Sequence, residues 1–174
     1  MKLTLPEEID KLAELKGGDY VLLSGTVYTA RDAAHKRMKE ALDKGQELPF
    51  DIIGSGIYYV GPTPSGEHIY GSAGPTTSSR MDVYTPQLCD LGLKYMIGKG
   101  KRNEEVREAI VRNKAVYFVA AGGAGALLSS CVTKVEDIAY EDLLSESIKK
   151  LTIKDMPLFV GIDTEGKDIY EEDE

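Results

Sequence analysis

The residues from Gly71 to Asp82 combine the side chains that an anion-binding pocket requires. Glycines and a proline interrupt regular structure at the start of this stretch, and four hydroxyl residues, Thr76 to Ser79, follow in a row. Such hydroxyls cap a helix, bind an anion, or do both. Arg80 comes four residues after Thr76, so a helix beginning here would bring both side chains to one side. We predict a carboxylate or phosphate pocket, with a capped turn before an ordinary surface helix as the alternative.

Two further cations stand at places where a strand is expected to end. Arg31 falls in the first turn of a predicted helix, for which Thr29 and Asp32 form a capping-box pattern. A cation there opposes the helix dipole, and an anion bound between Arg31 and the helix would offset that cost. The alternative is an exposed Arg31 paired with Asp32 or Glu40. Lys99 lies between two glycines directly after a strand, which suits ligand contact or a simple turn.

The histidines and cysteines indicate structural roles. His35 follows Arg31 by one helical turn, and His68 alternates with apolar residues on a predicted solvated strand face. Cys89 and Cys131 are isolated in apolar surroundings and have neither metal-ligand spacing nor a disulfide framework. We therefore expect no metal site in this chain.

The hydrophobic pattern predicts alternating strands and helices around these residues. Strands are expected at residues 20–28, 51–60, 67–70, 93–97, 115–121, 135–140 and 156–163. Helical spacing occurs at residues 6–16, 30–44, 77–91, 104–113 and 142–148. The small residues after Gly122 lack both the dinucleotide spacing and the P-loop Lys-Ser/Thr, and predict tight helix packing on the sheet. The fold class is α/β with a mixed sheet.

Composition indicates one soluble globular domain over residues 1–174. Apolar residues make up 42% and charged residues 29% of the chain, the net charge is −8 and the pI is about 4.9. This acidic balance argues against nucleic acid or an anionic membrane as the main partner. No run is apolar enough to span a bilayer, and the first residues lack the apolar core of a signal peptide, so a cytoplasmic location is expected.

Three motifs carry a resemblance to a known family. They are Thr-Ala-Arg-Asp-x-Ala-His at 29–35, Gly-Pro-Thr-Thr-Ser-x-Arg-Met-Asp at 74–82 and Ile-Gly-Lys-Gly at 97–100, followed by the Gly-Gly-Ala run from 122. In this order they resemble the β subunit, or the C-terminal domain of the fused enzymes, of the iron–sulfur hydro-lyases: class I fumarases and L-tartrate dehydratases. The resemblance extends from about Leu5 to Tyr170. It implies a swivelling β/β/α domain with a mixed sheet flanked by helices.

The resemblance also implies roles for particular residues. Arg31, Arg80 and Lys99 would bind the carboxylates of a small dicarboxylic acid. Thr76, with Thr77 as the competing assignment, would handle the C3 proton with help from a carboxylate of the other subunit. A [4Fe–4S] cluster held by three cysteines of the partner α subunit, not by this chain, would act as Lewis acid on the substrate. The chain would supply half an active site in an assembly of two α and two β chains.

Three functions are consistent with these observations. The first is the β subunit of a fumarate hydratase, which interconverts fumarate and (S)-malate. The second is the β subunit of an L-tartrate dehydratase, which forms oxaloacetate and water. The third is a non-catalytic carboxylate-binding or scaffolding module. In the first two cases we expect the cations to converge on one open pocket on an interface, and we expect Arg102, outside that pocket, to tolerate replacement by lysine.

Overall fold

The computed structural model describes residues 1–61, 73–120 and 125–171, which form one mixed sheet with helices beside it. The strands lie in the spatial order β1-β2-β3-β4-β5-β7-β6. Neighbours among β1 to β5 are parallel, whereas β7 is antiparallel to β2, β5 and β6. The strands are β1 (Lys2–Leu5), β2 (Tyr20–Thr29), β3 (Gly56–Tyr58), β4 (Tyr95–Gly98), β5 (Val116–Val119), β6 (Val132–Ala139) and β7 (Ile148–Ile162). The helices are α1 (Asp32–Asp43), α2 (Thr85–Asp90), α3 (Glu104–Asn113) and α4 (Gly125–Ser130), with short 3-10 helices η1 (Ile9–Glu14), η2 (Ser78–Met81) and η3 (Glu141–Glu146).

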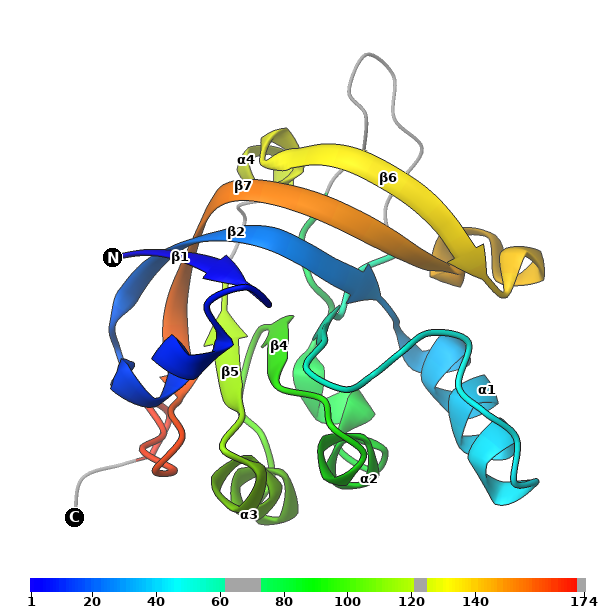
Figure 1. Cartoon of the computed structure of the whole chain (residues 1–174), viewed down its shortest axis with the longest axis horizontal. Helices are drawn as coiled ribbons and strands as arrows, with labels where there is room; N and C mark the ends of the chain where they lie inside the picture. The colour runs from blue at the N-terminus through cyan, green and yellow to red at the C-terminus, as the bar shows by residue number, and fades with distance from the viewer. Residues whose placement is uncertain (62–72, 121–124, 172–174) are drawn as a thin grey trace.

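The single sheet folds over on itself, and helices lie beside one part of it (Figure 1). Strands β1, β2, β7 and β6 arch over β4 and β5, and α1, α2 and α3 lie on the opposite side of those strands (Figure 1). Because β7 pairs with both β5 and β2, the strands β2, β3, β4, β5 and β7 close into a ring. The predicted α/β fold with a mixed sheet flanked by helices is confirmed.

Strand alternation creates two separate cores. In β4, the side chains of Tyr95 and Ile97 join the cluster enclosed by the strands, whereas Met96 joins the cluster beneath the helices. Phe118 and Tyr117 of β5 divide in the same way. Successive side chains of a strand point to opposite faces, so a strand buried on both faces reads as a continuous apolar run. This explains why residues 93–97 and 115–121 carried no alternation in the sequence.

Several predicted elements differ from those observed. Residues 6–16 form only the 3-10 helix η1, and the strand β1 before it was not predicted. The predicted last strand at 156–163 is the second half of the 15-residue β7, which reaches back to Ile148. In the first half of β7, Ile148, Leu151 and Ile153 are buried in the two cores, and the lysines lie between these apolar residues on a strand that pairs with β2 and β6. The strand predicted at 67–70, with His68, and the Gly-Gly-Ala run at 122–124 lie outside the described residues.

The start of α1 also corrects a prediction. Thr29 is not a helix cap: it is the last residue of β2, and its buried hydroxyl donates to the Ser147 carbonyl at 3.2 Å and accepts from the Lys149 amide at 3.0 Å. The strand continues this far because β7 pairs alongside it. The predicted end at Lys44 and Gly45 is confirmed, with Gly45 at φ +71°.

The helix predicted at residues 104–113 is present as α3, with a side-chain cap at its start. The Asn103 side chain accepts a hydrogen bond from the Val106 amide at 2.9 Å, so α3 begins where predicted. Of the helices within residues 1–61, 73–120 and 125–171, none has the length and hydropathy needed to cross a bilayer.

Candidate functional site

The predicted site residues lie at the carboxyl edge of the parallel strands. Arg31 follows β2 and Lys99 directly follows β4, and the carboxyl ends of parallel neighbours lie at one edge of a sheet. The hydroxyl run lies along the same edge. The Thr76 amide donates to the Tyr59 carbonyl at 2.8 Å, and Thr77 forms a parallel bridge with Lys99. The backbone therefore brings together segments far apart in the sequence.

Arg80 is the centre of the side-chain contacts. Its Nε is 3.0 Å from Asp32 Oδ1, and its Nη1 donates to Thr76 Oγ1 at 3.4 Å. The other Asp32 oxygen, Oδ2, is 3.9 Å from Arg31 Nη2. Asp32 thus lies between the two predicted arginines. Arg31, Thr76 and Arg80 form one connected group, and Lys99 joins it through the backbone of the hydroxyl run.

The cluster retains polar groups with capacity for a ligand. The Arg80 side chain is 54% exposed, and those of Arg31 and Asp32 are 27% and 34% exposed. Arg31 Nε and Asp32 Oδ2 are themselves buried, and within the described residues neither has a hydrogen-bond partner. Buried polar atoms without partners are rare in folded proteins. The group is therefore open to solvent on the Arg80 side and polar at its base.

The Arg31 side chain follows a fixed path out of the fold. A Cβ atom at Gly61 would stand 2.8 Å from Arg31 Cδ and 3.0 Å from the Ser145 carbonyl oxygen. Both distances are shorter than ordinary contacts, so a side chain at position 61 would crowd Arg31 where it passes between Gly61 and the η3 segment. Gly61 was not singled out in the sequence.

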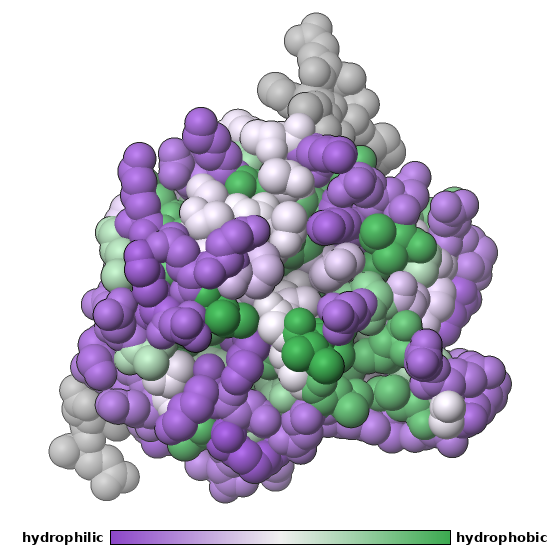
Figure 2. All heavy atoms as spheres, in the orientation of Figure 1, coloured by the Kyte–Doolittle hydropathy of each residue, from purple (hydrophilic) through white to green (hydrophobic). Residues whose placement is uncertain are grey.

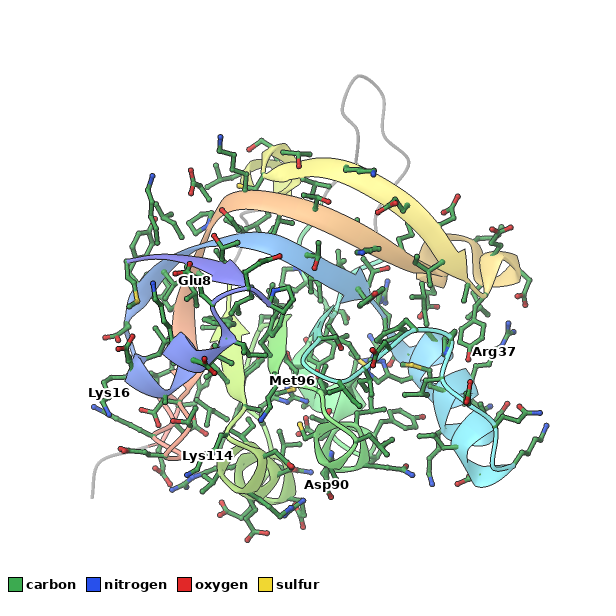
Figure 3. The ribbon with its side chains drawn as sticks, viewed as in Figure 1. Glu8, Lys16, Arg37, Asp90, Met96 and Lys114 are labelled. Atoms are coloured by element: carbon green, nitrogen blue, oxygen red, sulfur yellow. The ribbon has the colours of Figure 1, made fainter. Side chains whose placement is uncertain are left out.

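The η3 segment holds the beginning of α1. Arg31 is the N-cap residue in extended conformation rather than a first-turn residue, and Glu146 Oε1 accepts from the Ala33 amide at 3.2 Å. Arg37 on α1 reaches toward η3 (Figure 3) and pairs with both carboxylate oxygens of Asp142 at 2.7 and 2.8 Å. Asp32 and Glu146 therefore supply negative charge near this helix end from within the chain.

Ser78 anchors the hydroxyl run and was missed as an individual residue. Its buried Oγ accepts from the Lys99 amide at 3.0 Å and from the Tyr117 hydroxyl at 2.7 Å. The Ser78 amide in turn donates to the Lys99 carbonyl at 3.0 Å. A Cβ at Gly98 would lie 1.9 Å from Ser78 Oγ, so this glycine permits the close approach. Of the four hydroxyl residues, Ser78 is structural. The helix predicted at 77–91 is present as two helices, the 3-10 helix η2 and α2.

Arg102 lies at the centre of a buried hydrogen-bond network. Its side chain is fully buried, and its Nε donates to Asp82 Oδ1 at 2.6 Å. Its Nη2 donates to Thr85 Oγ1 at 2.8 Å and to the Tyr59 hydroxyl at 3.1 Å. Burial lowers the pKa of the guanidinium, but nearby Tyr59 and Asp82 outweigh burial and raise the pKa above its usual value. Arg102 is therefore an internal cross-link outside the group of Arg31, Thr76 and Arg80, and the small effect of Arg102→Lys on turnover stays a prediction.

His35 is buried below Arg31. Its Nδ1 lies 2.8 Å from the Arg31 carbonyl oxygen, which also accepts from the His35 amide at 2.9 Å. Since a carbonyl only accepts, Nδ1 carries the proton. Burial lowers the pKa of His35 to about 4, against the raising effect of this hydrogen bond, so the ring is neutral. The two hydrogen bonds from His35 to the Arg31 carbonyl oxygen fix the backbone at Arg31, so the role of His35 is structural.

The cysteines do not fit an iron–sulfur cluster. Cys89 belongs to the core beneath the helices and Cys131 to the core between the strands. Burial raises the pKa of the Cys89 thiol to about 12, and Cys131 Sγ donates to the Leu127 carbonyl. A cluster needs several thiolates at one place. Among the described residues, moreover, no three His, Cys, Asp or Glu side chains are placed to hold a metal ion.

An apolar groove lies apart from this cluster. Its volume is about 560 Å³, and Figure 2 shows hydrophobic side chains gathered over α1 and the loop after it, where the groove lies. None of the predicted site residues lines it. Its lining includes Leu42, Leu48, Pro49, Phe50, Ile52, Ile53 and Leu91.

Comparison with known proteins identifies the class of the chain. Residues 1–173 match the family described as "Fumarase C-terminus", and the chain belongs to this family. It is 36% identical to "Fumarate hydratase 2" of Leishmania major over 98% of the chain and 31% of that protein. It is 35% identical to "Fumarate hydratase class I, aerobic" of Escherichia coli K12 over 97% of the chain and 31% of that protein.

A relative of similar length is a separate subunit by name. The chain is 37% identical to the "Putative L(+)-tartrate dehydratase subunit beta" of Methanocaldococcus jannaschii, over 91% of the chain and 85% of that protein. The chain thus spans about a third of the length of the fumarate hydratases that it matches, and most of the length of the archaeal protein.

Proposed function

We propose that this chain is the β subunit of a fumarate hydratase that interconverts fumarate and (S)-malate. The observation that carries the proposal is the contact of one guanidinium, that of Arg80, with both Thr76 Oγ1 and Asp32, with Arg31 on the other side of Asp32. Guanidinium groups suit carboxylates because their planar N–H groups match the two oxygens. The two arginines and Lys99 would hold a dicarboxylate at the sheet edge.

Thr76 is the proposed proton-transfer group. Addition of water to fumarate places a hydroxyl on C2 and a proton on C3, and the reverse reaction removes that proton. A threonine hydroxyl alone is a weak base. A guanidinium next to its oxygen favours the deprotonated form, and the Arg80 Nη1 contact at 3.4 Å supports this assignment over Thr77. Thr77 pairs with Lys99 through the backbone and remains the competing residue.

The site is proposed to be completed by a partner. A [4Fe–4S] cluster is expected on an α subunit, because this chain's cysteines do not fit one. Exposed apolar residues near the cluster of cations support an interface: Val83, three residues after Arg80, is 77% exposed, and Leu144 of η3 is 78% exposed. An assembly of two α and two β chains is part of the proposal.

An L-tartrate dehydratase β subunit is the second candidate. It is favoured by the archaeal relative, whose name gives that activity and whose length is close to that of this chain. Both substrates are dicarboxylates, so the same cations would serve. A carboxylate-binding module without activity is the third candidate, and the connected Arg31–Asp32–Arg80–Thr76 group argues against it.

The test begins with two purifications under anaerobic conditions. The chain alone should contain neither iron nor sulfide, and stoichiometric cluster in it would overturn the division between two subunits. The chain co-expressed with a cluster-type α subunit and reconstituted with iron and sulfide should hydrate fumarate. Activity on tartrate instead would select the second candidate. Inactivity on both acids, with the cluster present and the two chains co-eluting, would leave the binding module.

A further inference from the structure

We propose that Asp32 is a positioning residue that sets which edge of the Arg80 guanidinium meets a substrate carboxylate. The inference rests on the proposed function and adds a residue that neither the sequence motifs nor the comparisons assign. It starts from one observation: the Asp32 carboxylate lies between two arginines, with Oδ1 3.0 Å from Arg80 Nε and Oδ2 3.9 Å from Arg31 Nη2.

Asp32 is the more firmly held member of the pair with Arg80. It is the first residue of α1, whose beginning is fixed by the Glu146 contact to the Ala33 amide and by the end of β2. Arg80 lies on η2, a four-residue 3-10 helix, and its side chain is 54% exposed. A long exposed side chain adopts many rotamers unless a contact selects one. Asp32 therefore orients Arg80, rather than the reverse.

The contact leaves a defined edge of Arg80 free. A guanidinium presents N–H groups along a side edge, which includes Nε, and along the terminal edge between Nη1 and Nη2. Asp32 occupies the Nε position, and Nη1 reaches Thr76 Oγ1. A substrate carboxylate then meets the terminal edge, beside the Thr76 hydroxyl. The same orientation brings the carboxylate and the proposed proton-transfer group into adjacent positions.

Asp32 also adjusts the charge of the site. Arg31, Arg80 and Lys99 carry three positive charges, and Asp32 lowers the net value to two, which matches the two negative charges of a dicarboxylate. Its Oδ1 pairs with Arg80, and its buried Oδ2, which has no hydrogen-bond partner within the described residues, faces Arg31. Removing this charge would leave the two guanidinium groups to repel each other.

A double-mutant cycle on the assembled enzyme tests the positioning role. Asp32→Ala should lower kcat/KM for fumarate about 10- to 100-fold in the wild-type background, since Arg80 loses its orientation. In the Arg80→Lys background, the same substitution should lower kcat/KM by a clearly smaller factor, because lysine has no edge to orient and only the effect of the Asp32 charge remains. Asp90→Ala is the matched control: Asp90 pairs with Arg112 Nε at 2.9 Å at similar exposure, away from the cluster, and its loss should leave kcat/KM unchanged.

A measurement on the isolated chain separates this inference from the proposed function. The Arg80 Nε–H signal in a 15N NMR spectrum should exchange slowly in the wild type and rapidly in Asp32→Asn, which keeps the shape of the side chain and removes its charge. Unchanged exchange overturns the inference, whatever the activity. An active enzyme with additive effects in the cycle overturns the role of Asp32 alone. A wild-type complex with no activity on fumarate or tartrate overturns the proposed function, and the substrate role of Asp32 with it.

Discussion

Arg102 and Asp82 form a buried ion pair that joins the two segments of the candidate site. The Nε–Oδ1 distance is 2.6 Å, and the two side chains are 0% and 6% exposed. Asp82 comes two residues after Arg80, and Arg102 comes three residues after Lys99. Asp82 Oδ2 also accepts from the Asn103 amide at 2.8 Å, and so ties η2 to the start of α3. The ion pair therefore holds the segment that contains Arg80 and the segment that contains Lys99 in fixed positions relative to each other.

We predict that Arg102→Ala lowers the free energy of unfolding by roughly 3–5 kcal/mol, because it leaves the Asp82 charge buried and unpaired. Arg102→Lys should lower it less, by about 1–3 kcal/mol, since an ammonium keeps the charge but cannot reproduce the forked contacts to Asp82 and Thr85. Urea unfolding of the isolated chain measures both. The control is Arg112→Ala at the half-exposed pair with Asp90, where a loss below about 1 kcal/mol is expected. Equal losses of stability in Arg102→Ala and Arg112→Ala would contradict the assignment of Arg102 and Asp82 as a buried ion pair.

The fold was largely predictable because burial patterns and caps are local. The strand at 20–28, the Asn103 cap and the end of α1 at Gly45 could be inferred from neighbouring residues alone. The first half of β7 could not be, because its lysines mark a strand only when β2 and β6 pair beside it. Thr29 was misassigned for the same reason: its hydroxyl is satisfied by Ser147 and Lys149, more than a hundred residues away.

The cationic residues of the candidate site could be predicted from the sequence. The residues that hold them in place could not. Positive charges beside glycines and hydroxyl residues could be recognised in the sequence at Arg31, Arg80 and Lys99. Their roles toward a substrate remain predictions. The sequence indicated Asp32 only as a helix-start residue or an ion-pair partner of Arg31, and Arg102 only as an arginine outside the site, because both positions follow ordinary surface patterns. Only the tertiary fold shows that one lies between two arginines and that the other is buried.

The buried His35 predicts a specific loss of stability in acid. Its pKa is lowered to about 4 in the folded chain, from about 6.5 when exposed, so the unfolded chain binds a proton more readily between these values. The contribution of neutral His35 is thus complete above pH 6.5 and is lost as the pH falls toward 4, by up to about 3 kcal/mol. The measurement is the free energy of unfolding of wild type and His35→Gln from pH 7.5 to 4.5. The excess stability of the wild type should shrink across this range, and parallel curves would refute the assignment.

Alanine substitutions at Gly98 and at Gly45 should both lower stability, but only the substitution at Gly98 should lower activity. A methyl group in Gly98→Ala would collide with Ser78 Oγ and the Tyr59 ring, and would push the hydroxyl run away from Lys99. We expect a stability loss of about 1–3 kcal/mol and a fall in kcat/KM of at least about tenfold in the assembled enzyme. Gly45→Ala provides the comparison: φ is +71° in open space after α1, so it should cost about 1–2 kcal/mol without loss of activity. If both variants keep full activity, the exact placement of the hydroxyl run is unimportant for turnover.

The central prediction concerns the chemistry at Arg80. Arg80→Lys keeps the positive charge but removes the planar fork that contacts Asp32 and Thr76 and would bind a substrate carboxylate. Loss of one charge-assisted contact to a buried carboxylate should cost roughly 2–5 kcal/mol of transition-state binding, on the order of 30-fold to several thousand-fold in kcat/KM.

The measurement is kcat/KM for fumarate hydration by the reconstituted complex, with cluster content and melting temperature matched between variants. Arg112→Lys, at an exposed ion pair away from the cluster, is the control in place of the buried Arg102, and should change kcat/KM very little. A purely structural Arg80 predicts a different pattern, with a small change in melting temperature and intact turnover. If Arg80→Lys stays within about threefold of wild type, which is under 1 kcal/mol, Arg80 does not bind the substrate carboxylate and the site assignment fails at its centre.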